Sequence, residues 1–152
     1  MTSFSALARA AALAALVALA GCSTGAGLSP GLTARMDRSG AQLNRGEALG
    51  IINHYRATVG AGALLEDPAL NAQAGNLATA YARTGRQPAK PAGVVEVRYS
   101  AGYATFADTF SGWRNSGQNS SVMSDKNVTR AGIAVVYEEN SPYGVYWVVI
   151  VA

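Results

Sequence analysis

The segment that most constrains the fold lies near the C-terminus, where residues 145–151 read Val-Tyr-Trp-Val-Val-Ile-Val. Almost all of its side chains are β-branched or aromatic, which is typical of a central strand covered on both faces. Upstream, Ala131, Ile133, Val135 and Tyr137 recur at every second position and predict another strand. The turn-rich residues 138–144 between them predict an antiparallel hairpin. Because apolar side chains on both faces of this hairpin must be buried, other segments of the chain are expected to pack on each face.

Two amphipathic helices are predicted ahead of the hairpin. Asn44 followed by Glu47 resembles a capping box and starts the first helix. Its apolar face, at helical spacing, consists of Ala48, Ile52, Tyr55 and Val59, and Gly60 ends it. Asp67 before Pro68 predicts the start of the second helix. Its apolar face consists of Leu70, Ala74, Leu77, Ala78 and Tyr81, and Gly85 ends it.

The middle of the chain predicts one strand and more helix. Residues 94–99 form the expected strand, and Thr105 can cap a helix whose core face is Phe106, Phe110 and Trp113. A short helix is expected around residues 120–123. The predicted fold class is therefore α+β: an α/β/α sandwich in which helices cover both faces of a small antiparallel sheet.

The N-terminus predicts export and a lipid anchor. Arg9 precedes an apolar run at residues 10–20, which is too short to span a bilayer but has the length of a secretory signal. Leu19-Ala20-Gly21-Cys22 then resembles the lipobox of bacterial lipoproteins, in which the chain is cut before an acylated Cys. The alternative is an ordinary cleaved signal peptide with a chance Cys. Ser23 after the Cys favours the outer membrane by the same resemblance. We therefore expect a protein of the bacterial cell envelope, attached to the membrane by acyl chains on Cys22.

These features divide the chain into a signal peptide at residues 1–21, a lipidated Cys with a tether at 22–43, and one folded domain at 44–152. The tether is rich in Gly and polar residues and lacks periodicity, although a part near residues 32–43 could pack on the domain. A net charge of +3, spread along the chain, gives no support to nucleic-acid binding. A single Cys excludes an internal disulfide.

Several motifs of the predicted domain resemble those of bacterial CAP domains, the relatives of cysteine-rich secretory, antigen 5 and pathogenesis-related proteins. The first is Asn53-His54-Tyr55-Arg56 followed by Gly60, Leu64, Asp67-Pro68 and Leu70. The later ones are Ser100-Ala101-Gly102-Tyr103, Trp113-Arg114-Asn115-Ser116, Met123, Gly132-Ile133-Ala134-Val135 and Tyr146-Trp147. The order and spacing of these motifs over residues 44–152 make the resemblance fairly specific.

Metal-binding CAP domains carry His and Glu residues in a central groove, and the resemblance places those positions on Leu77, Val97 and Asn119 here. Glu96 is one residue away from its family position, so on a strand it would point to the other face. The only histidine, His54, is outside the family's ligand positions and is expected to face solvent. We therefore expect no metal, no cofactor and no tight zinc site.

The candidate groove residues are Glu96, Tyr99, Ser116, Gln118 and Asn119. Asn53 and Arg56 are expected to be structural, because an amide and a five-donor guanidinium at this spacing can tie loop carbonyls to the first helix. The leading hypothesis is a non-catalytic binding module whose ligand is a lipid, a cell-wall fragment or a protein. Two alternatives stay open: a hydrolase with a non-standard site, since protease and other activities have been proposed for some CAP proteins, and a purely structural component of the envelope.

Overall fold

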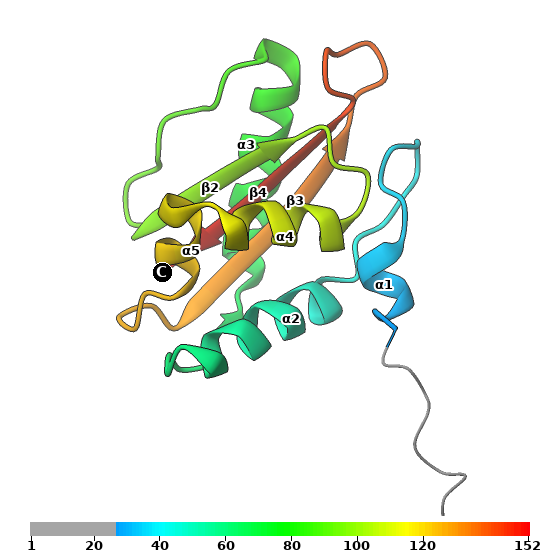
Figure 1. Cartoon of the computed structure of the whole chain (residues 1–152). Helices are drawn as coiled ribbons and strands as arrows, with labels where there is room; N and C mark the ends of the chain where they lie inside the picture. The colour runs from blue at the N-terminus through cyan, green and yellow to red at the C-terminus, as the bar shows by residue number, and fades with distance from the viewer. Residues whose placement is uncertain (1–26) are drawn as a thin grey trace, which may run out of the picture.

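A computed structural model describes residues 27–152 (Figure 1). The predicted signal peptide and Cys22 lie outside the described residues. The elements in chain order are α1 (Pro30–Thr33), α2 (Arg45–Thr58), β1 (Leu65–Glu66), α3 (Pro68–Thr84), β2 (Glu96–Ala101), α4 (Phe106–Asn115), α5 (Gly117–Met123), β3 (Arg130–Tyr137) and β4 (Val145–Val151).

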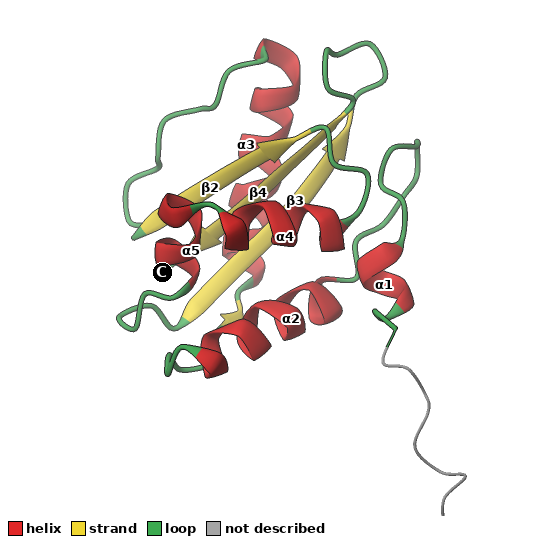
Figure 2. Ribbon diagram, in the orientation of Figure 1, coloured by secondary structure: helices red, strands yellow, loops and turns green. Residues whose placement is uncertain are grey.

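The strands form one sheet in the order β1-β3-β4-β2, and helices cover both of its faces (Figure 2). Helix α3 packs on one face, while α1, α2, α4 and α5 lie on the other. All seven residues of β4 are buried, as expected of a central strand. Odd-numbered residues of β4, such as Trp147, join the core under α2 and α4, and the even-numbered Val148 and Ile150 pack against α3. The predicted α/β/α sandwich is therefore confirmed.

The sheet is mixed rather than wholly antiparallel. β3 and β2 pair antiparallel with β4, as predicted for the hairpin. The two-residue β1 adds a parallel pair, Leu65 with Arg130 and Glu66 with Ala131. The sequence gives no sign of β1 because two residues show no periodicity and both side chains are exposed. β2 also begins and ends two residues later than predicted.

The predicted helix starts are confirmed by their caps. Asn44 Oδ1 accepts the Glu47 N–H at 3.1 Å, and Asp67 Oδ1 accepts the Ala69 and Leu70 N–H groups at 2.8 and 3.2 Å. Such side-chain acceptors satisfy donors that the first helical turn leaves free. The inclusion of Val59 in the first apolar face is wrong. Val59 is the C-cap of α2 and is 39% exposed, because the helix ends one residue earlier.

The packed domain begins earlier than the predicted residue 44. Leu32 of α1 and Met36 are buried in the core under α2 and α4. Ser29 Oγ donates to Glu47 Oε2 at 2.5 Å, and the Met36 N–H donates to the Ala104 carbonyl at 2.7 Å. Residues 29–43 therefore belong to the domain and are not a free tether.

Asn53 and Arg56 have the structural roles that the sequence predicts. The Asn53 amide exchanges two hydrogen bonds with the backbone of Leu64, at 2.8 and 3.0 Å. The fully buried Arg56 guanidinium donates to the carbonyls of Gly62, Met123 and Val128. The predicted core face of α4 is also confirmed, since Phe106, Phe110 and Trp113 are all buried.

Among the described residues, no helix is long and apolar enough to cross a membrane.

Candidate functional site

The strand β2 separates two of the predicted groove residues. Neighbouring side chains of a strand point to opposite faces, so residues three apart do as well. Val97 and Tyr99 pack with α3, and the Tyr81 ring meets the Tyr99 ring edge-on at 5.6 Å. Glu96 instead lines a hollow next to α5. Including Tyr99 in the same groove as Glu96 is therefore wrong.

The hollow beside Glu96 lies between the start of β2 and α5 and has a volume of about 350 Å³. We call it the β2–α5 hollow. Its lining residues are Val95, Glu96, Arg98, Ser121, Val122 and Asp125. Glu96 and Arg98 reach it because they occupy alternate positions of β2, and Ser121 and Val122 reach it from α5. Two valines contribute apolar surface to the lining, and two carboxylates and one guanidinium give it a net negative charge.

Arg98 is held at the inner edge of the β2–α5 hollow. Its Nη1 lies 3.2 Å from Glu96 Oε1 and donates to the Val97 carbonyl at 2.9 Å. Its Nη2 donates to the Gln118 carbonyl at 3.4 Å. The Arg98 Nε atom is buried and has no hydrogen-bond partner among the described residues. An unpaired buried donor costs free energy, and because this atom is shielded from solvent, an acceptor can reach it only if the side chain moves toward the hollow.

The remaining predicted residues do not converge on this hollow. Gln118 contributes only its backbone carbonyl, and its side chain is exposed. Ser116 lies at the junction of α4 and α5 and lines a different, more open hollow of about 500 Å³ with Tyr103 and Asp108. Asn119 is half-buried in α5 and lines neither hollow. Of the five predicted residues, the structure brings together only Glu96 and the backbone of Gln118.

Sequence reasoning missed Arg98, Ser121 and Asp125. Strand alternation could have found Arg98, because it lies two positions from Glu96 and therefore on the same face. Ser121 and Asp125 carry no such signal, since only the packing of α5 on β2 brings them to the strand.

The family's metal positions do not fit a metal ion here. Val97 is buried in the apolar cluster with Ala74, Ala78 and Val148, and Leu77 packs against the same cluster. Neither side chain offers a ligand atom. Within residues 27–152, no group of three His, Cys, Asp or Glu side chains could hold a metal. His54 lies exposed on α2.

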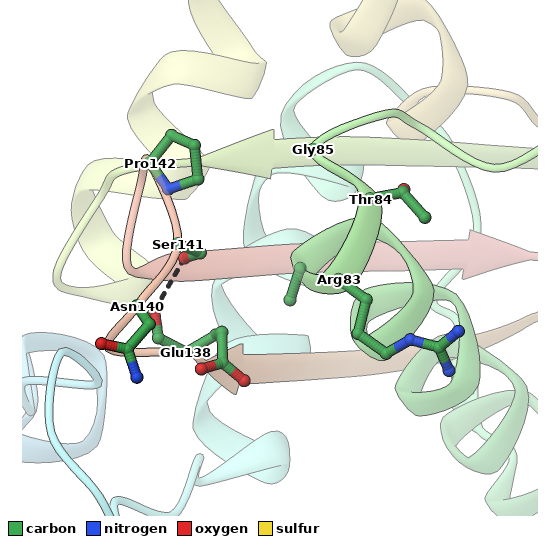
Figure 3. A pocket seen from close by; sticks show the side chains of 8 residues that line it. Arg83, Thr84, Gly85, Glu138, Asn140, Ser141 and Pro142 are labelled. Carbon is green, nitrogen blue, oxygen red and sulfur yellow. Dashed lines mark hydrogen bonds between the residues drawn. The ribbon is translucent and has the colours of Figure 1, made fainter.

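Another hollow, of about 380 Å³, lies between the C-terminal end of α3 and the loop joining β3 to β4 (Figure 3). Ser141 Oγ donates to the Glu138 carbonyl at 2.7 Å and closes this loop. Figure 3 shows that the Arg83 side chain extends away from Glu138. Because the charged groups do not converge, this hollow is a weaker candidate than the β2–α5 hollow.

An α/β/α sandwich with this strand order and these motifs defines a CAP-type domain. The model of the cysteine-rich secretory protein family, CAP, matches residues 49–151. The chain belongs to this family. A search of the curated proteins found no match.

Solved CAP structures share the fold at low sequence identity. The crystal structure of MpPR-1i superposes with a TM-score of 0.58 at 15% identity and covers 70% of this chain and 84% of that chain. A cysteine-rich secretory protein from Staphylococcus aureus gives a TM-score of 0.53 at 13% identity, covering 68% of this chain and 36% of its own. At such identities the comparison supports the fold alone.

Proposed function

We propose that this protein is a lipid-anchored CAP protein of the bacterial envelope whose domain binds a ligand without transforming it. The anchoring half rests on Leu19-Ala20-Gly21-Cys22 at the end of an apolar run. Labelled fatty acid should be incorporated into the protein, and Cys22→Ser should abolish that incorporation. An intact, unmodified Cys22 thiol in the mature protein would contradict the anchor.

The observation that carries the binding half is the β2–α5 hollow lined by Arg98, whose buried Nε has no hydrogen-bond partner among the described residues. A buried guanidinium N–H that lacks an acceptor is costly, and a small movement of Arg98 toward a ligand oxygen in the hollow would remove that cost. The surrounding Glu96, Asp125 and Ser121 add acceptors and a hydroxyl. This lining suits a neutral or cationic ligand rich in hydroxyl, amide or amine groups, as in a cell-wall fragment.

The chemistry of the hollow favours binding over hydrolysis. A serine nucleophile needs a base to accept its proton. Ser121 Oγ instead donates to the Gln118 carbonyl at 2.7 Å. The Glu96 carboxylate is engaged with Arg98 and with the Val97 N–H at 3.0 Å, and Asp125 accepts from Asn127. Ser121 therefore donates to a backbone carbonyl and not to a carboxylate that could activate it as a nucleophile.

Titration of the protein with a soluble, uncharged N-acetylglucosamine oligosaccharide, followed by NMR, tests the binding half. We expect shifts confined to amides of residues 95–98 and 118–125. Arg98→Gln should weaken binding about tenfold, the loss of one charge-assisted hydrogen bond. Arg83→Gln, on an exposed residue at the end of α3, is the matched control and should bind as the parent does. Shifts centred elsewhere, or none, would overturn this site and favour a structural role or a different ligand.

A further inference from the structure

The chain is fixed to the domain only a few residues after the predicted anchor. Ser29 Oγ donates a hydrogen bond to Glu47 Oε2, and Leu32, three residues later, is buried. Cys22 is seven residues before Ser29. Whatever conformation the intervening residues take, a chain spans at most about 3.3–3.6 Å per residue, or roughly 25 Å here. A domain of this size is itself roughly 35 Å across. An acylated Cys22 would therefore keep the domain within one diameter of the bilayer.

The surface next to this attachment point is apolar and has one arginine at its rim. Leu28, the second described residue, is 56% exposed. It borders a hollow of about 220 Å³ between α1, α2 and α4, lined by Leu28, Leu32, Ile51, Ala107, Phe110, Ser111 and Arg114. Arg114 is exposed and takes no part in the three ion pairs of residues 27–152. We call this surface the α1 face. Figure 1 shows α1, α2 and α4 on the side of the sheet opposite α3.

We propose that the α1 face docks on the phospholipid bilayer that holds the anchor. This inference rests on the acylation of Cys22 in the proposed function. Leu28 and the apolar lining of the hollow would contact the boundary between headgroups and acyl chains, and the Arg114 guanidinium would pair with lipid phosphates. Because the short segment after Cys22 would hold the domain close to the bilayer, contact between the two is effectively intramolecular. A surface of modest area is then sufficient for docking. Helix α3, on the opposite face, would point away from the membrane.

Photo-crosslinking to lipid tests the orientation. Benzoylphenylalanine replaces Ser111, on the rim of the hollow, or Thr79, exposed on α3, in the full chain produced in bacteria. The purified protein is placed in phosphatidylcholine vesicles with a fifth of phosphatidylglycerol and a trace of fluorescent phospholipid. We expect a fluorescent protein band with the Ser111 variant and little with the Thr79 variant. Adding Arg114→Glu should lower the Ser111 yield about fivefold, whereas adding Arg83→Glu should not.

Equal yields at both positions, or a higher yield at Thr79, would overturn the proposed orientation. Intact mass measurement separates this failure from a failure of the anchor, because acylation of Cys22 adds a defined mass. If that mass is missing, the Cys22 thiol of the same chain is coupled to a maleimide-bearing lipid and the crosslinking is repeated. The proposed function then fails at Cys22, while docking of the α1 face is still confirmed or overturned by the two yields.

Discussion

Arg56 shows how much of the local structure one side chain can organise. Its guanidinium lies at 2.6, 2.7 and 3.3 Å from the carbonyls of Gly62, Met123 and Val128, which belong to three separate segments. Burial lowers the pKa of Arg56 from its usual range, and the charge of Asp125 opposes that shift. An arginine guanidinium stays charged at neutral pH, so the three carbonyl oxygens stabilise its positive charge in place of water. Removing the side chain would leave all three without a partner.

Arg56→Ala should therefore lower the free energy of unfolding by about 3 kcal/mol or more, since hydrogen bonds to charged groups contribute about 1.5–3 kcal/mol each. Arg56→Lys keeps the charge but cannot reach three carbonyls with a planar fork, and it should lie between the parent and the Ala variant. Urea unfolding measures both. Arg83→Ala, on an exposed residue, is the control and should be nearly neutral. A loss below about 1 kcal/mol for Arg56→Ala would contradict this role.

Asp67 gives a pH-dependent prediction at the same scale. Hydrogen bonds from the Leu70 N–H, the Arg130 guanidinium and the Ala69 N–H hold the pKa of Asp67 below its usual 3.8, although burial opposes them. A carboxyl whose pKa is lowered on folding stabilises the protein above its unfolded pKa, and that contribution is lost as the pH falls through the folded pKa.

Asp67→Asn keeps an N-cap acceptor but removes the charge. It should be less stable than the parent at pH 7, and the difference should shrink steadily as the pH falls below about 4. Arg130→Gln, which removes one of the three causes, should reproduce only part of the difference. Thermal unfolding between pH 2 and 7 measures both. A difference that does not change with pH would show that the charge of Asp67 adds nothing to its cap.

At the scale of elements, β2 is an edge strand whose free edge is covered by side chains. The Val97 N–H donates to Glu96 Oε1, and the Val97 carbonyl accepts from Arg98. The Tyr99 carbonyl accepts from Trp113 Nε1 at 3.3 Å. Unpaired edge groups invite the addition of another strand, so this cover protects the sheet from self-association. Glu96 and Arg98 therefore protect an edge and also line the β2–α5 hollow.

The contact between α3 and β3 depends on Gly132. A Cβ atom at this position would lie 2.2 Å from the Leu70 carbonyl carbon and 2.5 Å from the Asn71 nitrogen, both of which are backbone atoms. The Ile133 N–H also donates to Asn71 Oδ1 at 2.8 Å. The helix can lie this close to the strand only because residue 132 has no side chain.

Gly132→Ala should thus destabilise the protein by about 3 kcal/mol or more, at the upper end of overpacking effects. The matched control is Gly50→Ala in α2, where a Cβ meets nothing within 4 Å. Gly50→Ala should stabilise by about 0.5–1 kcal/mol, because alanine is the better helix former. Equilibrium unfolding in urea measures both. Equal effects of the two substitutions would mean that α3 can shift away from β3 at little cost.

At the scale of the whole molecule, the N-terminal segment is part of the core. A chain that begins at residue 42 lacks Leu32 and Met36, which are 6% and 2% exposed. A chain that begins at residue 27 keeps them. Buried Leu or Met side chains contribute about 2–5 kcal/mol each when truncated to Ala. The shorter chain should therefore melt at a temperature lower by about 10 °C or more. Differential scanning calorimetry of the two chains decides this, and equal melting temperatures would restore the boundary at residue 44.

The whole domain should also bind no zinc tightly. Tight zinc sites need three or four ligands from Cys, His, Asp or Glu. Two of the family's positions, Leu77 on α3 and Val97 on β2, instead pack in the apolar cluster between that helix and the sheet. Calorimetric titration and elemental analysis test this prediction. A stoichiometric zinc with sub-micromolar affinity, lost on Glu96→Gln or His54→Ala, would reopen the case for an enzyme.

The sequence by itself determined the features that depend on short-range patterns. The caps at Asn44 and Asp67, the apolar stripes and the C-terminal hairpin follow from spacings within one element. The roles of Asn53 and Arg56 followed from their donors and their place near loops. In the candidate site, the sequence identified Glu96, because it lies one residue from a groove position of the CAP family.

Tertiary structure alone decided the features that depend on contacts between distant segments. The strand β1 exists because β3 offers it an edge, and residues 29–36 are ordered because α2 and α4 offer Leu32 a core. The β2–α5 hollow forms where α5 packs on β2, which brings Ser121 and Asp125 to Arg98. Strand alternation separates Tyr99 from Glu96, but only the packing of α3 decided what covers the face that Tyr99 shares with Val97. A local sequence pattern does not specify which distant segment will pack on it, so these features depend on the packing of the whole sandwich.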